Sequence, residues 1–185
     1  GNTRRNLSKG NLDPKYLSEK LVRIEEQTAR AAGIIDHMGM FGREATERSE
    51  SIDPRNVVMN ALDLMGEQLR LAGIEVVTVL PDECSCVFGH AIQMEQVILN
   101  LLTNARDAIE ESEGIAKITV RVSESDKAVQ ITVQDTGKGI PADVLHRIFE
   151  PFYTTKEMGR GTGLGLSVSY GIVRDMKGTI IAENI

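Results

Sequence analysis

Residues Gly159 to Ile172 read GRGTGLGLSVSYGI, with glycine at positions 159, 161, 163 and 165 directly before a periodic apolar run. Glycine costs about 1 kcal/mol relative to alanine inside a helix, so this density at a helix start indicates a backbone that bends sharply or is closely approached. Unpaired N–H groups at a helix N-terminus, together with the helix dipole, bind anions. The stretch therefore predicts a phosphate-binding turn that leads into a helix.

Two other glycine-rich phosphate motifs fit this stretch less well. A P-loop ends in G-K-[ST], which the run lacks, so the P-loop fold is excluded. A dinucleotide site requires G-x-G-x-x-G directly after a strand, whereas Leu166 occupies the last glycine position and a polar loop precedes the run. Glu183, about 20 residues further on, keeps a nicotinamide site open as an alternative. Preferential binding of NAD over ATP would support it.

Upstream, QMEQVILNLLTNARDAIE (residues 93–110) belongs to a helix that we expect from Ala91 to about Glu111. Its buried stripe leaves Gln96, Asn100, Asn104 and Asp107 together on another face. Asparagine is a poor helix former, so two of them one turn apart sacrifice helix stability for another purpose. A carboxamide oxygen suits a hard cation that arrives bound to phosphates, while the alternative is an ordinary solvated helix face.

Between these stretches, VQITVQDTGKGI (residues 129–140) runs a strand into Asp135 and then into a turn made by Gly137 and Gly139. A carboxylate at a strand end can face a pocket and accept a hydrogen bond from an exocyclic amine. A plain polar turn is the alternative. The D-T-G of an aspartic protease is disfavoured, because that site needs two carboxylates sharing a proton and this chain has one such triplet and much helix.

The composition excludes several classes of function. The 185 residues carry a net charge of −6 without a basic stripe, which argues against nucleic acid or an anionic membrane as the main partner. No apolar run approaches the roughly 18 residues of a membrane span. Cys84 and Cys86 are too close in sequence for a zinc half-site and are expected to be ordinary small residues, as in a reducing cytoplasm.

The N-terminal region predicts one long helix from Asp13 to about Ala45, followed by a polar linker, REATERSESID. Its apolar and small positions alternate in spacings of four and three: Leu17, Leu21, Ile24, Thr28, Ala31, Ile35 and Met38. This heptad period favours a coiled coil with a partner helix over an ordinary docked helix.

The remaining pattern predicts an α+β fold. Helices are expected at Pro54–Leu71, Ala91–Glu111 and Leu164–Met176, and strands at Ile74–Leu80, Lys117–Val122, Ala128–Gln134 and Thr179–Ala182. A short polar connection between two of the strands implies an antiparallel pair. The expected architecture is a two-layer α/β sandwich, in which a mixed sheet is covered by three helices.

Taken together, these segments resemble the ATP-binding catalytic domain of sensor histidine kinases, of the superfamily shared with DNA gyrase and MutL. QVILNLLTNARDAI resembles the asparagine box, DTGKGI the first glycine box, IFEPFYTTK the phenylalanine box and GRGTGLGLS the second glycine box, in the family's order. The resemblance covers residues 51–185. Residues 1–48 resemble part of the helical region for dimerisation and histidine phosphotransfer, mainly its second helix.

The resemblance implies a binding site for Mg-ATP. Asn104 would be the main Mg²⁺ ligand with Asn100 in support, Asp135 would hold the adenine amine, and residues 153–160 would be a lid over the triphosphate. Catalysis would involve Asn100, Asn104, Lys156 and Arg160. The nucleotide contacts implied are Asn104, Asp107, Asp135, Gly137, Gly139, Ile140, Phe149, Phe152, Thr155, Lys156, Gly161, Thr162, Gly163, Leu164, Gly165, Leu166 and Thr179.

The implied function is transfer of the γ-phosphate of ATP to a histidine, for relay to an aspartate of a response regulator. His37, His90 and His146 lack the context of the family's acceptor, so the acceptor is expected upstream of Gly1 and this chain is not expected to phosphorylate itself. The full-length protein would be a homodimer. The part with this sequence would be cytoplasmic, and a membrane anchor in another part of the full-length protein is compatible with this expectation. The alternative function is an ATP-dependent regulatory or dimerisation module without transferase activity.

Overall fold

The computed structural model describes residues 18, 20, 49–125, 128–156 and 161–185. The chain divides into two compact units, of which the larger comprises residues 45–153 and 163–185 and the smaller residues 1–44 and 154–162. The long helix expected over residues 13–45 lies outside the described residues, apart from Ser18 and Lys20, which are helical. The larger unit carries the sheet and its covering helices.

The central sheet has the strand order β2-β4-β5. Strand β2 (Glu75–Val79) runs parallel to β4 (Lys117–Glu124), and β5 (Val129–Asp135) runs antiparallel to β4. The mixed sheet expected from the sequence is therefore confirmed. Alternation along β4 buries Ile118, Val120 and Val122 on one face of the sheet.

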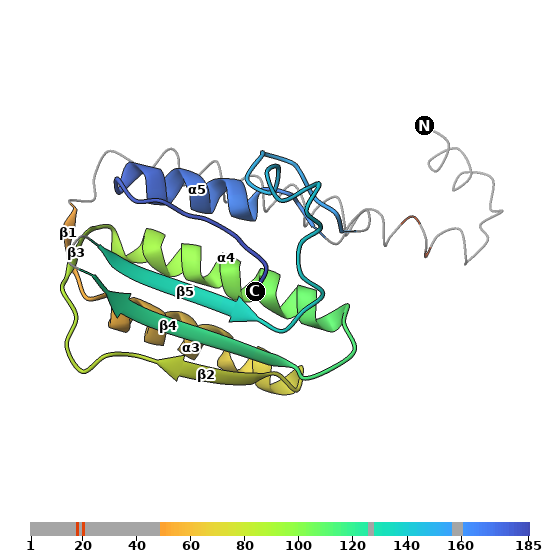
Figure 1. Ribbon diagram of the computed structural model, residues 1–185, viewed down its shortest axis with the longest axis horizontal. Helices are drawn as coiled ribbons and strands as arrows, with labels where there is room; N and C mark the ends of the chain where they lie inside the picture. The colour runs from red at the N-terminus through yellow and green to blue at the C-terminus, as the bar shows by residue number, and fades with distance from the viewer. Residues whose placement is uncertain (1–17, 19, 21–48, 126–127, 157–160) are drawn as a thin grey trace, which may run out of the picture. The chain divides into compact units, whose positions relative to one another are not determined.

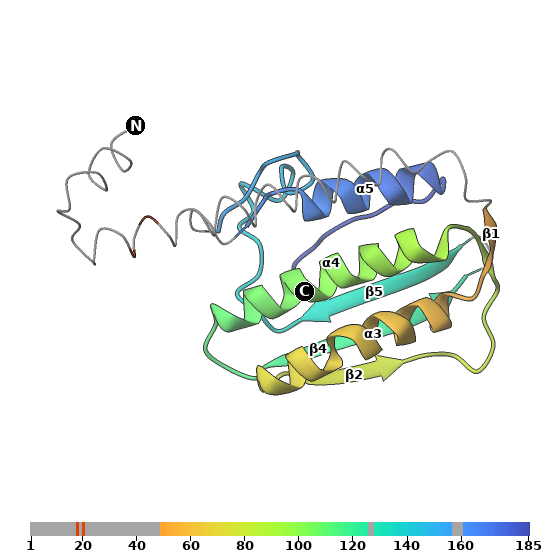
Figure 2. The ribbon, with the colours of Figure 1, turned by 180° about the vertical axis from the view of Figure 1, so that it is seen from behind.

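Helices α3 (Pro54–Leu71) and α4 (Ala91–Glu110) lie on one face of this sheet, as the two opposite views in Figures 1 and 2 show. Helix α5 (Gly165–Asp175) packs against α4. The side chain of Asp53 caps α3 by accepting the Arg55 N–H, and Pro54 occupies the first turn. Beyond the helix, Gly73 adopts a left-handed φ of 72°. The core between helices and sheet is made of Ile52, Val57, Val58, Ala61, Met65, Leu69, Ile74, Ile98, Leu102, Ala105, Ile109, Ile118, Val120 and Val122.

A second, two-stranded sheet pairs β1 (Glu50–Ile52) with β3 (Val87–Gly89) in antiparallel register. The sequence assigned residues 50–52 to the polar linker, because three residues are too few to show an alternating pattern. Burial of Ile52, 5% exposed, ties this small sheet to the core. Gly89 lies against the Met176 side chain, so the small sheet also contacts the C-terminal end of α5.

The strand expected at Thr179–Ala182 is wrong, since these residues form no ladder in the structure. The segment leaves α5 through Lys177, at φ 61°, and a hydrogen bond of 2.8 Å from the Gly178 N–H to the Val173 carbonyl. It then returns toward the turn after β5, where the side chain of Asn184 binds backbone (Figure 1). A side-chain contact thus replaces the expected backbone pairing.

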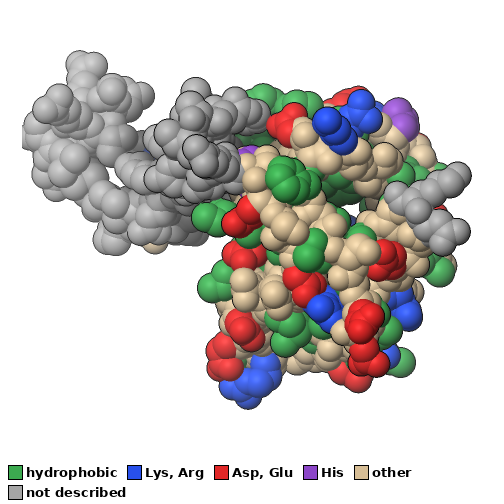
Figure 3. Space-filling view, turned by 90° about the vertical axis from the view of Figure 1, so that its left-hand side faces the viewer, with side chains coloured by type: hydrophobic (Ala, Val, Ile, Leu, Met, Phe, Trp, Pro, Cys, Tyr) green, Lys and Arg blue, Asp and Glu red, His purple; other side chains and the backbone are tan. Residues whose placement is uncertain are grey.

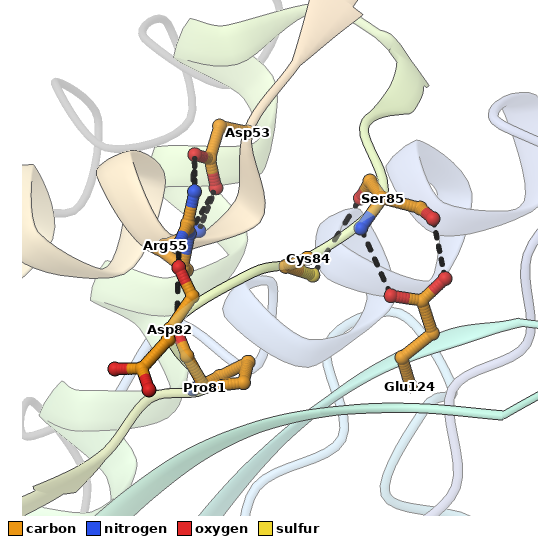
Figure 4. A network of polar contacts seen from close by, with 7 residues as sticks. All are labelled: Asp53, Arg55, Pro81, Asp82, Cys84, Ser85 and Glu124. Atoms are coloured by element: carbon orange, nitrogen blue, oxygen red, sulfur yellow. Dashed lines mark hydrogen bonds and ion pairs between the residues drawn. The ribbon is translucent and has the colours of Figure 1, made fainter.

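Polar contacts fasten the loop between β2 and β3 at the end of the sheet away from Asp135 (Figure 4). Arg55 bonds both carboxylate oxygens of Asp53 and the carbonyls of Pro81 and Asp82. On the other side of the loop, Ser85 donates its N–H and its hydroxyl to the Glu124 carboxylate.

These contacts shift the pKa values of the groups involved. The Arg55 guanidinium lowers the pKa of Asp53, and the bonds from the Ser85 hydroxyl and N–H lower that of Glu124. Burial raises the pKa of the Cys84 thiol. Cys84 and Cys86 are both free thiols, so neither forms a disulfide.

Acidic and basic side chains are interspersed on the face shown in Figure 3, without a continuous basic field among its described residues. No helix in the described part of the chain is long and apolar enough to cross a membrane.

Candidate functional site

The candidate site is organised along α4, where Asn100, Asn104 and Ala108 recur every four residues and share one face of the helix. The two glycine-containing turns meet α4 at the ends of this stripe. Gly165, at the start of α5, lies against the Asn100 side chain, and Gly137, after β5, lies against Ala108. Eight residues of helix separate the two contacts by about 12 Å, with Asn104 midway between them.

Asp135 ends β5 on the helix-covered side of the sheet, because it pairs with buried Ile118. Its Oδ1 accepts the Gly137 N–H at 2.8 Å. A Cβ at Gly137 would lie only 2.7 Å from the backbone carbon and Cβ of Ala108, so a side chain there would push the turn away from α4. The turn therefore carries the Asp135 carboxylate close to the C-terminal half of α4.

Three further contacts brace this turn, and no pattern in the sequence predicts any of them. The Thr136 hydroxyl accepts the Lys117 N–H at 3.0 Å and donates to the Ile115 carbonyl, and the Lys138 ammonium pairs with Glu111. Gly139 takes a φ of 71°, beside the carboxamide of Asn184. Among these residues only the D-T-G-K-G spacing was visible in the sequence, and Asn184 carried no signal.

Asn100 is tied to the first turn of α5 through its side-chain nitrogen. Nδ2 donates to the Gly165 carbonyl at 3.1 Å and to the Ser169 hydroxyl at 3.2 Å. The carboxamide is half-buried. Asn104 follows one turn later and is also half-buried. The two asparagines therefore lie between the glycine turns.

Helix α5 starts at Gly165 with Leu164 as its N-cap residue, so no side chain caps its N-terminus. Just before it, Gly163 has a φ of 67° and lies so close to Phe152 that a Cβ would meet the Phe152 carbonyl carbon at 2.5 Å. Phe152 itself has a φ of 65°, which is rare for an aromatic residue. The two left-handed residues therefore lie in direct contact with each other.

The phenylalanine-box residues are held by aromatic contacts. The Phe149 and Tyr170 rings lie 5.6 Å apart between centroids, and the Arg147 guanidinium lies 4.4 Å from the centre of the Tyr153 ring. Phe149 is thereby attached to α5, whereas the Phe152 side chain is 63% exposed.

Other expected site residues are distributed as follows. Thr155, Lys156, Gly161 and Thr162 belong to the smaller unit, in which Gly161 lies against Thr154 and Lys156. Arg160 and His37 lie outside the described residues.

Asp107 accepts a bond of 2.8 Å from Arg106, so its charge is partly neutralised by its neighbour. The backbone N–H of Ile140 donates to the side chain of Asn184. Leu166 lies in the first turn of α5, and Thr179 is an exposed residue beyond the C-terminal end of α5.

The donor set fits a divalent ion that brings most of its ligands with it. Within the described residues, no group of three or more His, Cys, Asp or Glu side chains could hold a metal ion. The Asn100 nitrogen is committed to α5, which leaves its carboxamide oxygen as the group for a cation. One or two neutral oxygens suffice for Mg²⁺ when phosphates and water supply the remaining positions.

A family model described as "Histidine kinase-, DNA gyrase B-, and HSP90-like ATPase" matches residues 89–184, just over half of the chain. The chain belongs to this ATPase family. Similar proteins include sensor histidine kinases of two-component systems. The two-component sensor PprA of Pseudomonas aeruginosa is 43% identical over 187 residues, 99% of this chain and 20% of PprA. The sensor kinase CckA of Brucella abortus is 37% identical over 186 residues, 93% of this chain and 19% of CckA.

Among solved structures, the nucleotide-free catalytic domain of histidine kinase ThkA matches with a TM-score of 0.60 and 29% identity, over 70% of this chain and 82% of that domain. The fold is therefore that of a histidine kinase catalytic domain. The chain spans about a fifth of the length of the two curated relatives, so it corresponds to one part of such a sensor.

Proposed function

We propose that residues 51–185 bind Mg-ATP and transfer its γ-phosphate to a histidine, for relay to an aspartate of a response regulator. The observation that carries this proposal is the placement of the two glycine turns at opposite ends of the α4 asparagine stripe. One turn offers a carboxylate and the other a helix N-terminus that no side chain caps. A nucleotide needs a hydrogen-bond acceptor such as this carboxylate at its base, and positively polarised N–H groups such as those of a helix N-terminus at its phosphates.

At one end of the site, Asp135 accepts a hydrogen bond from the adenine amine, while the backbone of Gly137, Gly139 and Ile140 forms the surrounding turn. The Gly137 N–H already occupies Oδ1 of Asp135, which orients the carboxylate and leaves Oδ2 for the base. At the other end, Gly163 to Leu166 present the N-terminus of α5 to the phosphates. Phe149, Phe152, Thr155, Thr162 and Thr179 complete the proposed contacts.

Asn104, with Asn100 in support, holds the Mg²⁺ that comes with the phosphates. When bound, the ion neutralises charge on the phosphate oxygens. Lys156 and Arg160 are proposed to add positive charge from the segment between Phe152 and Gly163, and Asp107 lies at the edge of the same stripe. Catalysis then rests on positioning and charge neutralisation, as expected for phosphoryl transfer.

The residues present favour transfer over hydrolysis. The resemblance implies that Asn100 corresponds to the glutamate with which the ATP-hydrolysing members of the superfamily activate water, and an amide cannot take a proton from water. The γ-phosphate is instead held for an imidazole nitrogen, whose lone pair forms the new N–P bond as the bond to the ADP oxygen breaks. His90 is the N-cap residue of α4 and contacts Ser49. We propose that none of His37, His90 and His146 is the acceptor, because none has the sequence context of the family's acceptor histidine.

The wider context is also a proposal. Residues 1–48 form part of the dimerisation and phosphotransfer bundle, the full-length protein is a cytoplasmic or membrane-anchored homodimer, and a response regulator receives the phosphate. An ATP-dependent regulatory module without transferase activity is the alternative. It predicts nucleotide binding without phosphate transfer to any supplied acceptor.

Calorimetric titration with ATP, ADP, GTP and NAD, each with and without Mg²⁺, tests nucleotide binding directly. We expect Mg²⁺-dependent binding of ATP and ADP and no preference for NAD. The Asp135→Asn variant should bind adenine nucleotides about 5- to 100-fold more weakly, because its amide can turn a donor toward the donor of the base. Substitution of Gln134, exposed on the other face of β5, serves as the control. Equal affinity of D135N and the unaltered chain would remove Asp135 from the site.

The metal assignment needs its own variant. Asn104→Ala should lose most of the Mg²⁺-dependent part of ADP affinity, whereas Gln96→Ala, two turns earlier on α4, should keep it. Transfer is tested with γ-labelled ATP and an added helical fragment that carries an acceptor histidine. Acid-labile label on the fragment, and none on the chain itself, supports the kinase; label on His37, His90 or His146 contradicts the acceptor proposal.

A further inference from the structure

Among the described residues, Ser169 is the one polar side chain that is fully buried, with 0% exposure. It lies on α5, where its hydroxyl donates to the Gly165 carbonyl at 3.0 Å and accepts the Asn100 Nδ2 at 3.2 Å. A buried hydroxyl without partners would cost free energy, but here donor and acceptor are both used. Ser169 therefore links α5 to the asparagine stripe of α4.

The chemistry of this contact fixes the orientation of the Asn100 carboxamide. A backbone carbonyl can only accept, so the side of the carboxamide that faces Gly165 must be the NH₂ group. The NH₂ group donates toward both the Gly165 carbonyl and the Ser169 hydroxyl, which are themselves joined by a hydrogen bond of 3.0 Å and so lie on the same side of the nitrogen. Since nitrogen and oxygen lie on opposite sides of the carboxamide carbon, the oxygen is turned away from both acceptors.

We infer that Ser169 is a positioning residue for the nucleotide site, which acts by holding the Asn100 carboxamide with its oxygen available to the phosphate-bound cation. The inference rests on the proposed function. Ser169 does not touch the nucleotide or the cation. Without its hydroxyl, Asn100 keeps one acceptor, the Gly165 carbonyl, and the terminal torsion of an asparagine has a broad energy profile. The oxygen would then be oriented less often for the cation.

A purely structural role for Ser169 predicts something different. If the hydroxyl only joins two helices, its removal lowers the free energy of unfolding and weakens ADP binding equally with and without Mg²⁺. A positioning role changes the ratio of these two affinities. This Mg²⁺ ratio is the readout that separates the two roles.

The experiment compares Ser169→Ala with Ser167→Ala in the full chain, with ADP titrated in Mg²⁺ and in EDTA. Ser167 is a matched control, because its hydroxyl also bonds a backbone carbonyl, that of the N-cap residue Leu164 at 2.9 Å, and no bond to Asn100 is seen. We expect the Mg²⁺ ratio to fall about two- to tenfold in S169A, the value of one hydrogen bond, and to stay unchanged in S167A. In an Asn100→Ala background, S169A should have no further effect on the ratio.

An unchanged ratio in S169A, or an equal fall in both serine variants, overturns the inference while ADP binding by the unaltered chain still supports the proposed function. No ADP binding by the unaltered chain overturns both. Should S169A fail to fold, Ser169→Cys, whose thiol is a weaker donor and acceptor, is measured in its place. A fall of the Mg²⁺ ratio in S169C is expected, and an unchanged ratio overturns the inference.

Discussion

The carboxamide of Asn184 binds both backbone groups of Ile140. Its Oδ1 accepts the Ile140 N–H at 2.8 Å, and its Nδ2 donates to the Ile140 carbonyl at 2.7 Å. One side chain thus reproduces the pair of bonds that a neighbouring β-strand residue would make. The bound residue directly follows Gly139, whose φ is 71°, so Asn184 holds the end of the turn that begins at Asp135.

We expect Asn184→Ala to weaken ADP binding severalfold, because the turn after β5 loses two hydrogen bonds of about 1 kcal/mol each. Asn184→Asp should be similarly weakened, since a carboxylate keeps the bond from the Ile140 N–H but repels its carbonyl. Calorimetry with ADP measures both effects, and Glu183→Ala, at the preceding exposed position, is the control. Wild-type affinity in both Asn184 variants would show that the turn holds its shape without this contact.

Lys177→Gly should stabilise the fold by about 1 kcal/mol. Lys177 follows α5 with a φ of 61°, and the left-handed conformation costs an L-residue roughly 1–2 kcal/mol that glycine avoids. Chemical denaturation measures the change in the free energy of unfolding. Lys177→Ala removes the same charge and chain but keeps the backbone cost, so it should bring no comparable gain. Equal stabilisation by both would assign the effect to the lysine side chain.

Gly163→Ala should destabilise the fold more than Gly73→Ala. Both glycines have left-handed φ values, 67° and 72°, but a Cβ at Gly73 meets nothing within 4 Å whereas one at Gly163 would collide with the Phe152 backbone. Gly73→Ala therefore carries only the conformational cost of about 1 kcal/mol, and Gly163→Ala adds a steric cost. Denaturation curves of the two variants give the difference, and equal losses would rule out the close contact.

Acid should destabilise the loop between β2 and β3. The pKa values of Asp53 and Glu124 lie below their ordinary values of 3.8 and 4.5 in the folded chain, so both groups stabilise the fold when ionised. This contribution is complete above the ordinary values and is lost as the pH falls through the lowered ones. Asp53→Asn keeps a capping side chain at α3 but not the charge, so its unfolding free energy should depend less on pH in this range. An unaltered acid dependence would refute the role of Asp53.

The long periodic elements were predictable from the sequence, because their patterns extend over many residues. Helix α3 begins and ends at the expected residues, and α4 differs by one residue at its C-terminal end. The pairing of β1 with β3 could not be predicted, since each strand has three residues and no alternation. The pattern at residues 179–182 predicts a strand, but it does not reveal whether a neighbouring strand is available for pairing.

At the candidate site, the residue types in the sequence predict Asn100 and Asp135 as site residues, but they do not predict the residues that orient these two side chains. Asn100 and Asp135 were identified because an asparagine pair and a carboxylate before glycines are unusual in a helix and a strand end. Ser169 and Asn184 were not, since their partners lie 69 and 44 residues away in sequence. A serine in an apolar helix and an asparagine in a polar tail show no local pattern that reveals such contacts.

The same separation has a consequence for biosynthesis. Asn100 meets Gly165 and Ser169 only after another 65 and 69 residues have been added to the chain. At about 5–20 residues per second, that interval lasts roughly 3–14 s. During this time the ribosome-bound chain already contains α4 with its asparagines, but not the helix that Asn100 contacts. Under the proposed function, nucleotide binding through this site therefore requires a chain whose synthesis has passed α5.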